Sequence, residues 1–237
     1  RQEAVRELAP KLDDRARLHA AASAEERALL DDARIKAWAE DPDRLPAEPL
    51  LWVVGATLPV LLASTFVIYQ LGGPGLPLGL AVITQLLVIF ALGRWVGPRV
   101  GVLSGPERTL RRAKRTIAFI EAWSLEAPWL QARRERMAEA GASREIQRLA
   151  RLVNLLDARL NVVFALTLGP ALMWDLNIVL RTERWRRKHG HAIHHWFEAV
   201  GDFEALASLA ALAYERPDYG FAEFEGEGRF EATQLRH

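Results

Sequence analysis

One stretch of this sequence limits the possible folds more than any other, because residues 50–93 contain no Asp, Glu, Lys, Arg or His. The stretch is 44 residues long, about twice the length that one helix needs to cross a bilayer. Glycines and prolines in QLGGPGLPLG (Gln70–Gly79) mark a single turn within it. We therefore predict two membrane spans, about 51–71 and 78–96, in a transmembrane helical hairpin that occupies residues 49–97. A helical hairpin buried in a soluble core is the alternative.

The charges that flank the hairpin predict its orientation. The connecting turn carries no charge, whereas basic residues follow the second span closely: Arg94, Arg99, Arg108, Arg111, Arg112, Lys114 and Arg115. By the positive-inside rule, both soluble arms are expected in the cytoplasm, with the hairpin in the inner (cytoplasmic) membrane and the lipid bilayer as a partner. Trp52 and Trp95 lie near the ends of the hairpin, where aromatic membrane anchors are common.

The hairpin contains too few polar residues for a transport pathway. Its polar side chains are Thr57, Ser64, Thr65, Gln70, Thr84 and Gln85. None of them is charged, so the spans offer neither an ion relay nor a buried counter-ion. This composition favours an anchor over a small transporter or channel subunit.

The soluble arms predict an all-α fold with long cytoplasmic lever-type helices. Apolar residues at helical spacing indicate two helices within residues 3–40, the second opened by a capping box at Ser23 and Glu26. Further helices are expected after a capped start at Ser104–Glu107, and then at Pro128–Ala140, Ser143–Leu160 and Ala192–Tyr214. A short strand is expected at the extreme C-terminus, Arg229–Leu235.

Residues 160–180 are ambiguous. They form a 21-residue segment with one charge, Asp175, and this length suffices for a third span. Gly169 and Pro170 at the centre and the carboxylate of Asp175 argue against insertion. A core helix that is buried or abuts the membrane and a partly inserted segment both remain possible.

Candidate sites for chemistry are few. The chain has no cysteine, carries a net charge of +1, and contains no phosphate-binding loop or nucleophile motif. His191, His194 and His195 share a helical face but lack an evident third or fourth ligand, so we predict no metal site. One basic stretch could contact lipid head groups or the phosphates of DNA, through Arg181, Arg184, Arg186, Arg187 and Lys188.

The C-terminal third resembles the MutS family of DNA mismatch-repair ATPases. FEALASLAALAYERPDYGFAEF followed by GRFEATQLRH is similar to the junction between a lever helix and the first strand of that family's ATPase domain. The lever-helix stretch matches at Leu206, Ala207, Ser208, Leu209 and Ala210. The linker matches at Tyr214, Pro217 and Tyr219, and Arg236 and His237 match the start of a Gly/Arg-His-Pro motif. Residues 160–190 also look like a membrane-anchored MutS-like subgroup.

The resemblance implies a lever that couples an ATPase to the membrane. The implied segments are N-terminal helices (1–48), the hairpin, a core/lever domain (104–216), and a linker with the first ATPase strand (217–237). The chain ends before the family's phosphate loop, so we expect no cofactor in these residues, and ATP and Mg²⁺ in a longer protein. That protein would form a homodimer through its ATPase domain, with DNA as a possible partner and no small-molecule substrate evident. A membrane scaffold or adaptor that binds partner helices without nucleotide is the alternative function.

Overall fold

The structure is a computed structural model that describes residues 1–22, 26–41, 48–103 and 107–221. Four predictions lie outside these residues: the caps at Ser23 and at 104–106, the strand at 229–235, and the placement of Arg236 and His237.

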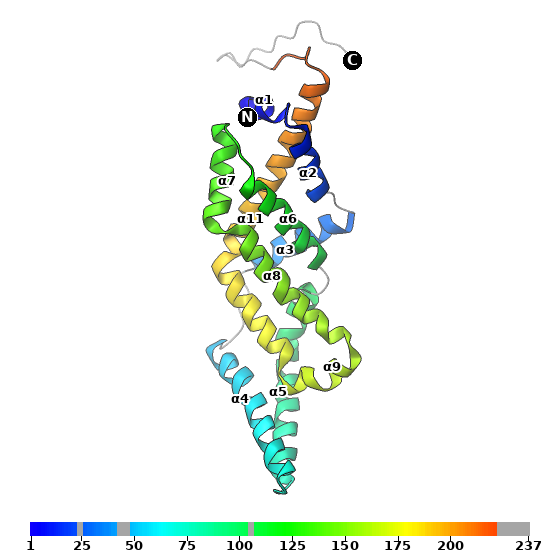
Figure 1. Ribbon diagram of the computed structural model, residues 1–237. Coiled ribbons are helices and arrows are strands. Elements are labelled where there is room, and N and C mark those ends of the chain that lie inside the picture. The colour runs from blue at the N-terminus through cyan, green and yellow to red at the C-terminus, as the bar shows by residue number, and fades with distance from the viewer. Residues whose placement is uncertain (23–25, 42–47, 104–106, 222–237) are drawn as a thin grey trace.

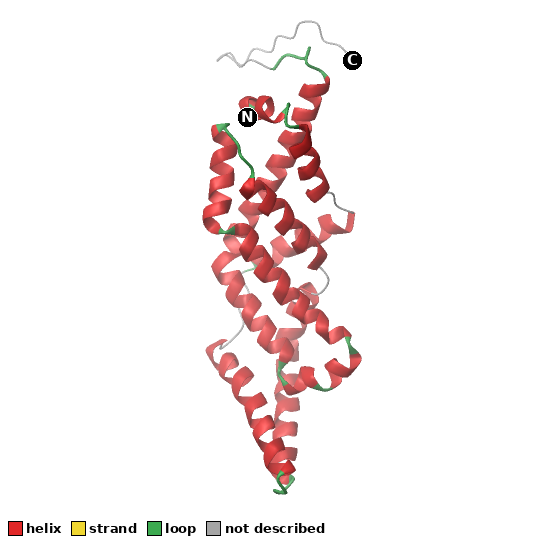
Figure 2. Cartoon of the chain, in the orientation of Figure 1, coloured by secondary structure: helices red, strands yellow, loops and turns green. Residues whose placement is uncertain are grey.

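The described residues form helices and connecting turns, without a strand, which confirms the all-α fold class (Figure 2). The elements are α1 (Gln2–Leu8), α2 (Leu12–Ala22), α3 (Glu26–Glu40), α4 (Glu48–Gln70), α5 (Leu76–Leu103), α6 (Glu107–Ala122), α7 (Pro128–Ala140), α8 (Ala142–Asp157), the 3-10 turn η1 (Ala158–Leu160), α9 (Val162–Leu166), α10 (Leu168–Ala171) and α11 (Trp174–Glu215).

The molecule is elongated, with the α4–α5 hairpin at one end and the N-terminus and the end of α11 at the other (Figure 1). The two hairpin helices pack against each other, and their turn forms one tip of the molecule. α11 runs from beside the hairpin toward the opposite end.

The first predicted helix is divided in two. α1 ends at Leu8 and α2 begins at Leu12, because Pro10 between them has no N–H to donate and restricts the preceding residue. The side chain of Arg15 donates to the carbonyl of Ala9 at 3.0 Å and so binds a group that the helix break leaves free. The apolar spacing from Leu8 to Leu12, which suggested one helix, therefore continues across the bend between α1 and α2.

The last helix is longer than predicted. We expected it to begin at Ala192, but α11 begins at Trp174 and continues for 42 residues. Gly190 does not end it, because this glycine lies buried where α3 crosses α11: a Cβ built at Gly190 would lie 2.6 Å from the carbonyl oxygen of Ala39. The glycine therefore permits a close helix crossing.

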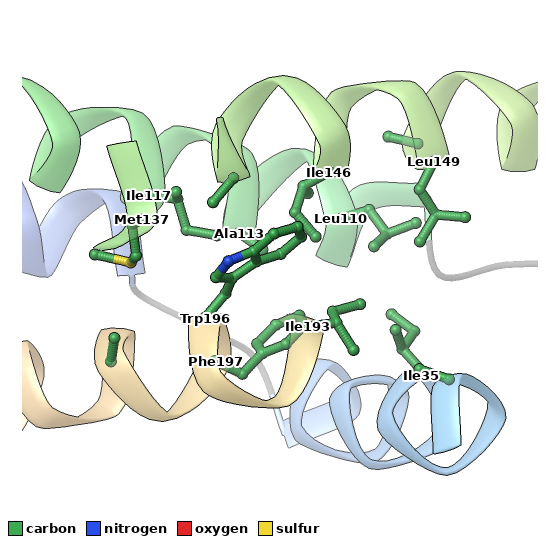
Figure 3. Close-up of a cluster of buried hydrophobic side chains, with 14 of the residues drawn as sticks. Ile35, Leu110, Ala113, Ile117, Met137, Ile146, Leu149, Ile193, Trp196 and Phe197 are labelled. Atoms are coloured by element: carbon green, nitrogen blue, oxygen red, sulfur yellow. The ribbon is translucent and has the colours of Figure 1, made fainter. Parts of the chain in front are cut away.

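One hydrophobic core joins the helices outside the hairpin (Figure 3). Leu110 and Ile117 of α6 and Ile146 of α8 face Ile193 and Trp196 of α11 across this core. The N-terminal helices, which we predicted as a segment of their own, contribute to the same core through Leu8, Leu18 and Ile35. The soluble part thus surrounds α11 on several sides, and its core holds that helix in place.

Candidate functional site

The apolar side chains of the hairpin are exposed. Helices α4 and α5 are both long and apolar enough to cross a membrane, and only 17% and 11% of the residues in their most apolar 18-residue windows are buried. Phe90, for example, has 86% of its surface exposed. The alternative of a hairpin buried in a soluble core is therefore wrong, because the rest of the chain, as far as the structure describes it, does not cover these helices.

Three of the hairpin's hydroxyl groups are satisfied within their own helix. Thr57 donates to the carbonyl of Val53, Ser64 to that of Val60, and Thr65 to that of Leu61. Such bonds allow a hydroxyl to lie in an apolar helix without another partner. These groups therefore form no chain of polar contacts along α4.

Gln85 differs from these hydroxyls because it binds another element. Its side chain is buried in the contact between α5 and α10. Its Nε2 donates to the carbonyl oxygens of Pro170 at 2.6 Å and Ala171 at 2.8 Å. From the sequence alone, Gln85 was predicted only as one of several polar residues in the hairpin. An isolated amide in an apolar run was the available signal that it binds a backbone elsewhere.

Tryptophans and arginines meet where the hairpin joins the soluble part. The guanidinium of Arg94 lies 4.0 Å from the ring centre of Trp95, and that of Arg184 lies 4.5 Å from the ring centre of Trp52. We call these four residues the belt. Cation–π pairs between Arg and Trp suit a membrane–water interface, where an aromatic body meets a wet polar surface. Trp52 lies 18 residues before the end of α4 and Trp95 lies 19 residues after the start of α5, so both are about equally far from the hairpin turn along their helices.

The predicted basic stretch divides between two faces of α11. Arg181, Arg184, Arg187 and Lys188 are exposed. Arg187 forms an ion pair with Glu48 at the start of α4. The outward-facing residues therefore lie beside the base of the hairpin, on the side where head groups would meet a membrane-inserted α4.

Arg186, by contrast, belongs to the core. It is buried, donates to Glu183 at 2.6 Å and to the carbonyl oxygen of Trp38 at 3.2 Å, and lies over the Trp38 ring. Burial raises the pKa of Glu183, and the nearby Arg186 and Arg99 oppose this rise. The candidate head-group or phosphate contact at Arg186 is therefore a structural ion pair instead.

The base of α11 is attached to the hairpin. The Nδ2 of Asn177 donates to the carbonyl oxygen of Gly55 in α4 at 3.0 Å. A Cβ built at Gly55 would lie 2.9 Å from the Oδ1 of Asn177, so the two helices approach closely here. Together with the ion pair to Glu48, this contact joins the first turns of α11 to α4.

The predicted lever–ATPase junction lies at the other end of α11. Leu206 is buried, whereas Ser208, Leu209, Tyr214, Pro217 and Tyr219 are exposed. A cavity of about 790 Å³ opens between α2 and this part of α11, lined by residues that include Arg15, Ser208 and Tyr214. The guanidinium of Arg15 lies 5.7 Å from the ring centre of Tyr214. The structure thus presents the junction as an open surface.

The histidines lie near the middle of α11. The Nε2 of His194 is 3.1 Å from Glu198, its Nδ1 is 3.5 Å from Glu40, and His191 and His195 are exposed. Within the described ranges, no three His, Cys, Asp or Glu side chains gather as a metal would require. His189 is partly buried beside Glu145, and this burial lowers the pKa of its imidazole, although the carboxylate opposes the shift.

Residues 160–180 do not form one spanning helix. They comprise the end of η1, the short helices α9 and α10, and the start of α11. Large apolar side chains are exposed along this segment: Leu160, Val162, Val163, Leu166, Leu168 and Leu172. A cavity of about 500 Å³ lies between part of this segment and residues 89–97 of α5. The segment is thus neither a third span nor a buried core helix.

Comparison of the chain with protein-family models, curated proteins and solved structures finds no match.

Proposed function

We propose that this chain is the membrane anchor and lever of a MutS-like ATPase. The α4–α5 hairpin crosses the inner membrane, both soluble arms lie in the cytoplasm, and α11 links the hairpin to an ATP- and Mg²⁺-binding domain beyond the junction. The observation that carries the proposal is the continuity of α11, whose 42 residues span about 63 Å at 1.5 Å per residue. One end of this helix contacts α4 and the other carries the junction residues.

The packing of α11 supports a role in transmission. A long helix can transmit a displacement only if neighbouring elements resist its bending, and buried residues from Leu176 to Ala210 pack α11 into the core on several sides. In a homodimer that forms through the ATPase domains, nucleotide-driven movement at the junction would reach the membrane through this helix. DNA remains a possible partner of that assembly through the exposed arginines.

Membrane anchoring can be tested by flotation of the purified chain with phospholipid vesicles in a density gradient. We expect the chain to float, and Leu61→Arg or Leu87→Arg to reduce the floated fraction several-fold, because each places a charge on an exposed apolar position of a span. Leu209→Arg is the matched control, since Leu209 is also exposed but lies near the junction. Equal flotation of all variants would contradict the anchor.

The MutS-like assignment is tested by the coding sequence after His237. A proline followed within some tens of residues by GxxxxGK[ST] supports it, because this loop binds the phosphates of ATP. A stop codon at that point supports the membrane scaffold or adaptor instead. Residues 1–237 alone are expected not to hydrolyse ATP, since they contain no phosphate loop, and measurable turnover would contradict the proposal.

A further inference from the structure

The segment of residues 160–173, which we call the dip, carries an inference that rests on the proposed anchoring. Its apolar side chains are almost as exposed as those of the spans: 76% of Leu166 and 72% of Val163 are exposed, compared with 86% of Phe90 in α5. A surface of this kind is costly in water and marks a contact with lipid or with another protein. The position of the dip relative to the belt indicates whether lipid is available for this contact.

The position of the dip follows from two independent helices. Along α5, Gln85, which binds the dip, lies nine residues from Arg94 of the belt, or about 13 Å. Along α11, Trp174 lies ten residues from Arg184 of the belt, or about 15 Å. Both helices place the dip on the side of the belt that faces the hairpin turn. These depths fall within one half of a hydrocarbon core that is about 30 Å thick.

Side chains of α5 and α11 bind backbone carbonyl groups at the end of the dip. The chain leaves helical geometry near Met173, whose φ is +49°, and the break frees carbonyl groups. Of these, the carbonyl of Ala171 accepts from Gln85 at 2.8 Å and that of Leu172 accepts from Asn177 at 3.0 Å. The carbonyls of Pro170 and Met173 already accept the backbone N–H groups of Met173 and Asn177, and each accepts a second bond from the same two side chains. Non-helical backbone at membrane depth is tolerated when protein groups satisfy it in this way.

Polar side chains in and beside the segment also bind local partners. Asn161 accepts from the N–H of Phe164 at 3.2 Å, and the hydroxyl of Thr167 donates to the carbonyl of Val163 at 2.6 Å. Arg159 and Asp175, at the two ends of the segment, lie 3.8 Å apart as an ion pair. Between these two residues the chain carries no charged side chain.

We infer that the dip is a re-entrant membrane element that enters and leaves the half of the bilayer nearer the belt, with lipid acyl chains as its partner. Its exposed surface continues that of α5, to which Gln85 attaches it. The dip supplies a third point of insertion without crossing the membrane, and it embeds the first turn of α11 in the lipid. The lever helix therefore begins inside the bilayer.

Labelling of single cysteines tests this inference, because the natural chain has no cysteine. Val163→Cys and Leu166→Cys probe the dip, Phe90→Cys probes the span, and Leu209→Cys probes the exposed junction. The variants are reconstituted in vesicles of phosphatidylcholine and phosphatidylglycerol and treated with a membrane-impermeant maleimide. We expect the dip and span cysteines to react at least tenfold more slowly than Leu209→Cys.

The outcomes separate this inference from the proposed anchoring. Rapid labelling of both dip cysteines with protection of Phe90→Cys would overturn the re-entrant element and leave the anchor intact. Rapid labelling of Phe90→Cys would overturn the anchor itself. A nitroxide attached at residue 166 shows whether lipid or protein contacts the dip. High accessibility of the nitroxide to oxygen and low accessibility to a water-soluble nickel complex indicate lipid. Low accessibility to both would show that protein covers the dip and would contradict the inference.

Discussion

At the scale of single residues, the basic stretch of α11 shows what a linear pattern of charge can and cannot predict. The sequence correctly indicates a concentration of positive charge, but it groups Arg186 with its exposed neighbours. Three residues after Glu183, Arg186 lies on the inward face of the helix, where the two side chains pair. Which face is inward depends on α3 and on Trp38, which lies 148 residues away in sequence. Periodicity within the stretch alone therefore did not identify the buried pair.

Arg186→Leu is expected to lower the free energy of unfolding by about 3 kcal/mol, because it leaves the carboxylate of Glu183 buried without its nearest partner. The double variant Glu183→Leu/Arg186→Leu should lose less than the sum of the two single losses. Arg187→Ala is the control, since its exposed pair with Glu48 should contribute about 0–1 kcal/mol. Urea unfolding in detergent, followed by circular dichroism, measures each value. Equal losses for Arg186→Leu and Arg187→Ala would contradict the structural role.

At the scale of helices, glycine explains both a correct boundary and a wrong one. Gly141 ends α7 as predicted, with a left-handed φ of +60° that suits a helix C-cap. The last helix was predicted to begin at Ala192, two residues after Gly190, yet Gly190 lies inside α11 with a role in packing. The difference depends on whether a second helix crosses at the glycine, and this tertiary contact is invisible in the local sequence. Helix α7, which has its own proline start and glycine end, was predicted at its observed bounds.

Two glycines of α11 provide a matched test of the helix crossing. Gly190→Ala should destabilise the protein by about 1–3 kcal/mol, because the new methyl group would press on the backbone oxygen of Ala39. Gly201→Ala meets no atom within 4 Å and should stabilise the helix by about 0.5–1 kcal/mol. Thermal unfolding followed by circular dichroism compares the two variants. A stabilising Gly190→Ala would show that α3 does not cross α11 this closely.

At the scale of the molecule, the sequence predicted the hairpin but not how residues 160–173 attach to it. The hairpin follows from residues 50–93 alone, because absence of charge over this length has few structural solutions. The attachment of the dip to α5 does not follow, because Gln85 and Pro170 are 85 positions apart and a hydrogen bond to a backbone carbonyl leaves no residue pattern. The candidate junction was predicted as the end of a lever helix followed by a linker and a strand, but which elements lie beside it depended on the tertiary fold.

The continuity of α11 can be measured on the whole protein. Nitroxide labels at the exposed positions 181 and 209, which are 28 residues apart, should give one narrow distance distribution centred near 42 Å. The distance is measured by pulsed electron–electron double resonance on the chain reconstituted in vesicles. A broad or bimodal distribution would reveal a hinge within α11 and would remove the basis for a rigid lever.

The pair of hydrogen bonds at Gln85 has a mechanical consequence. Sliding of α10 along α5 would pull the carbonyls of Pro170 and Ala171 away from the buried amide, and a buried amide that loses its partners costs free energy. The two bonds therefore resist a displacement of α10 along the axis of α5.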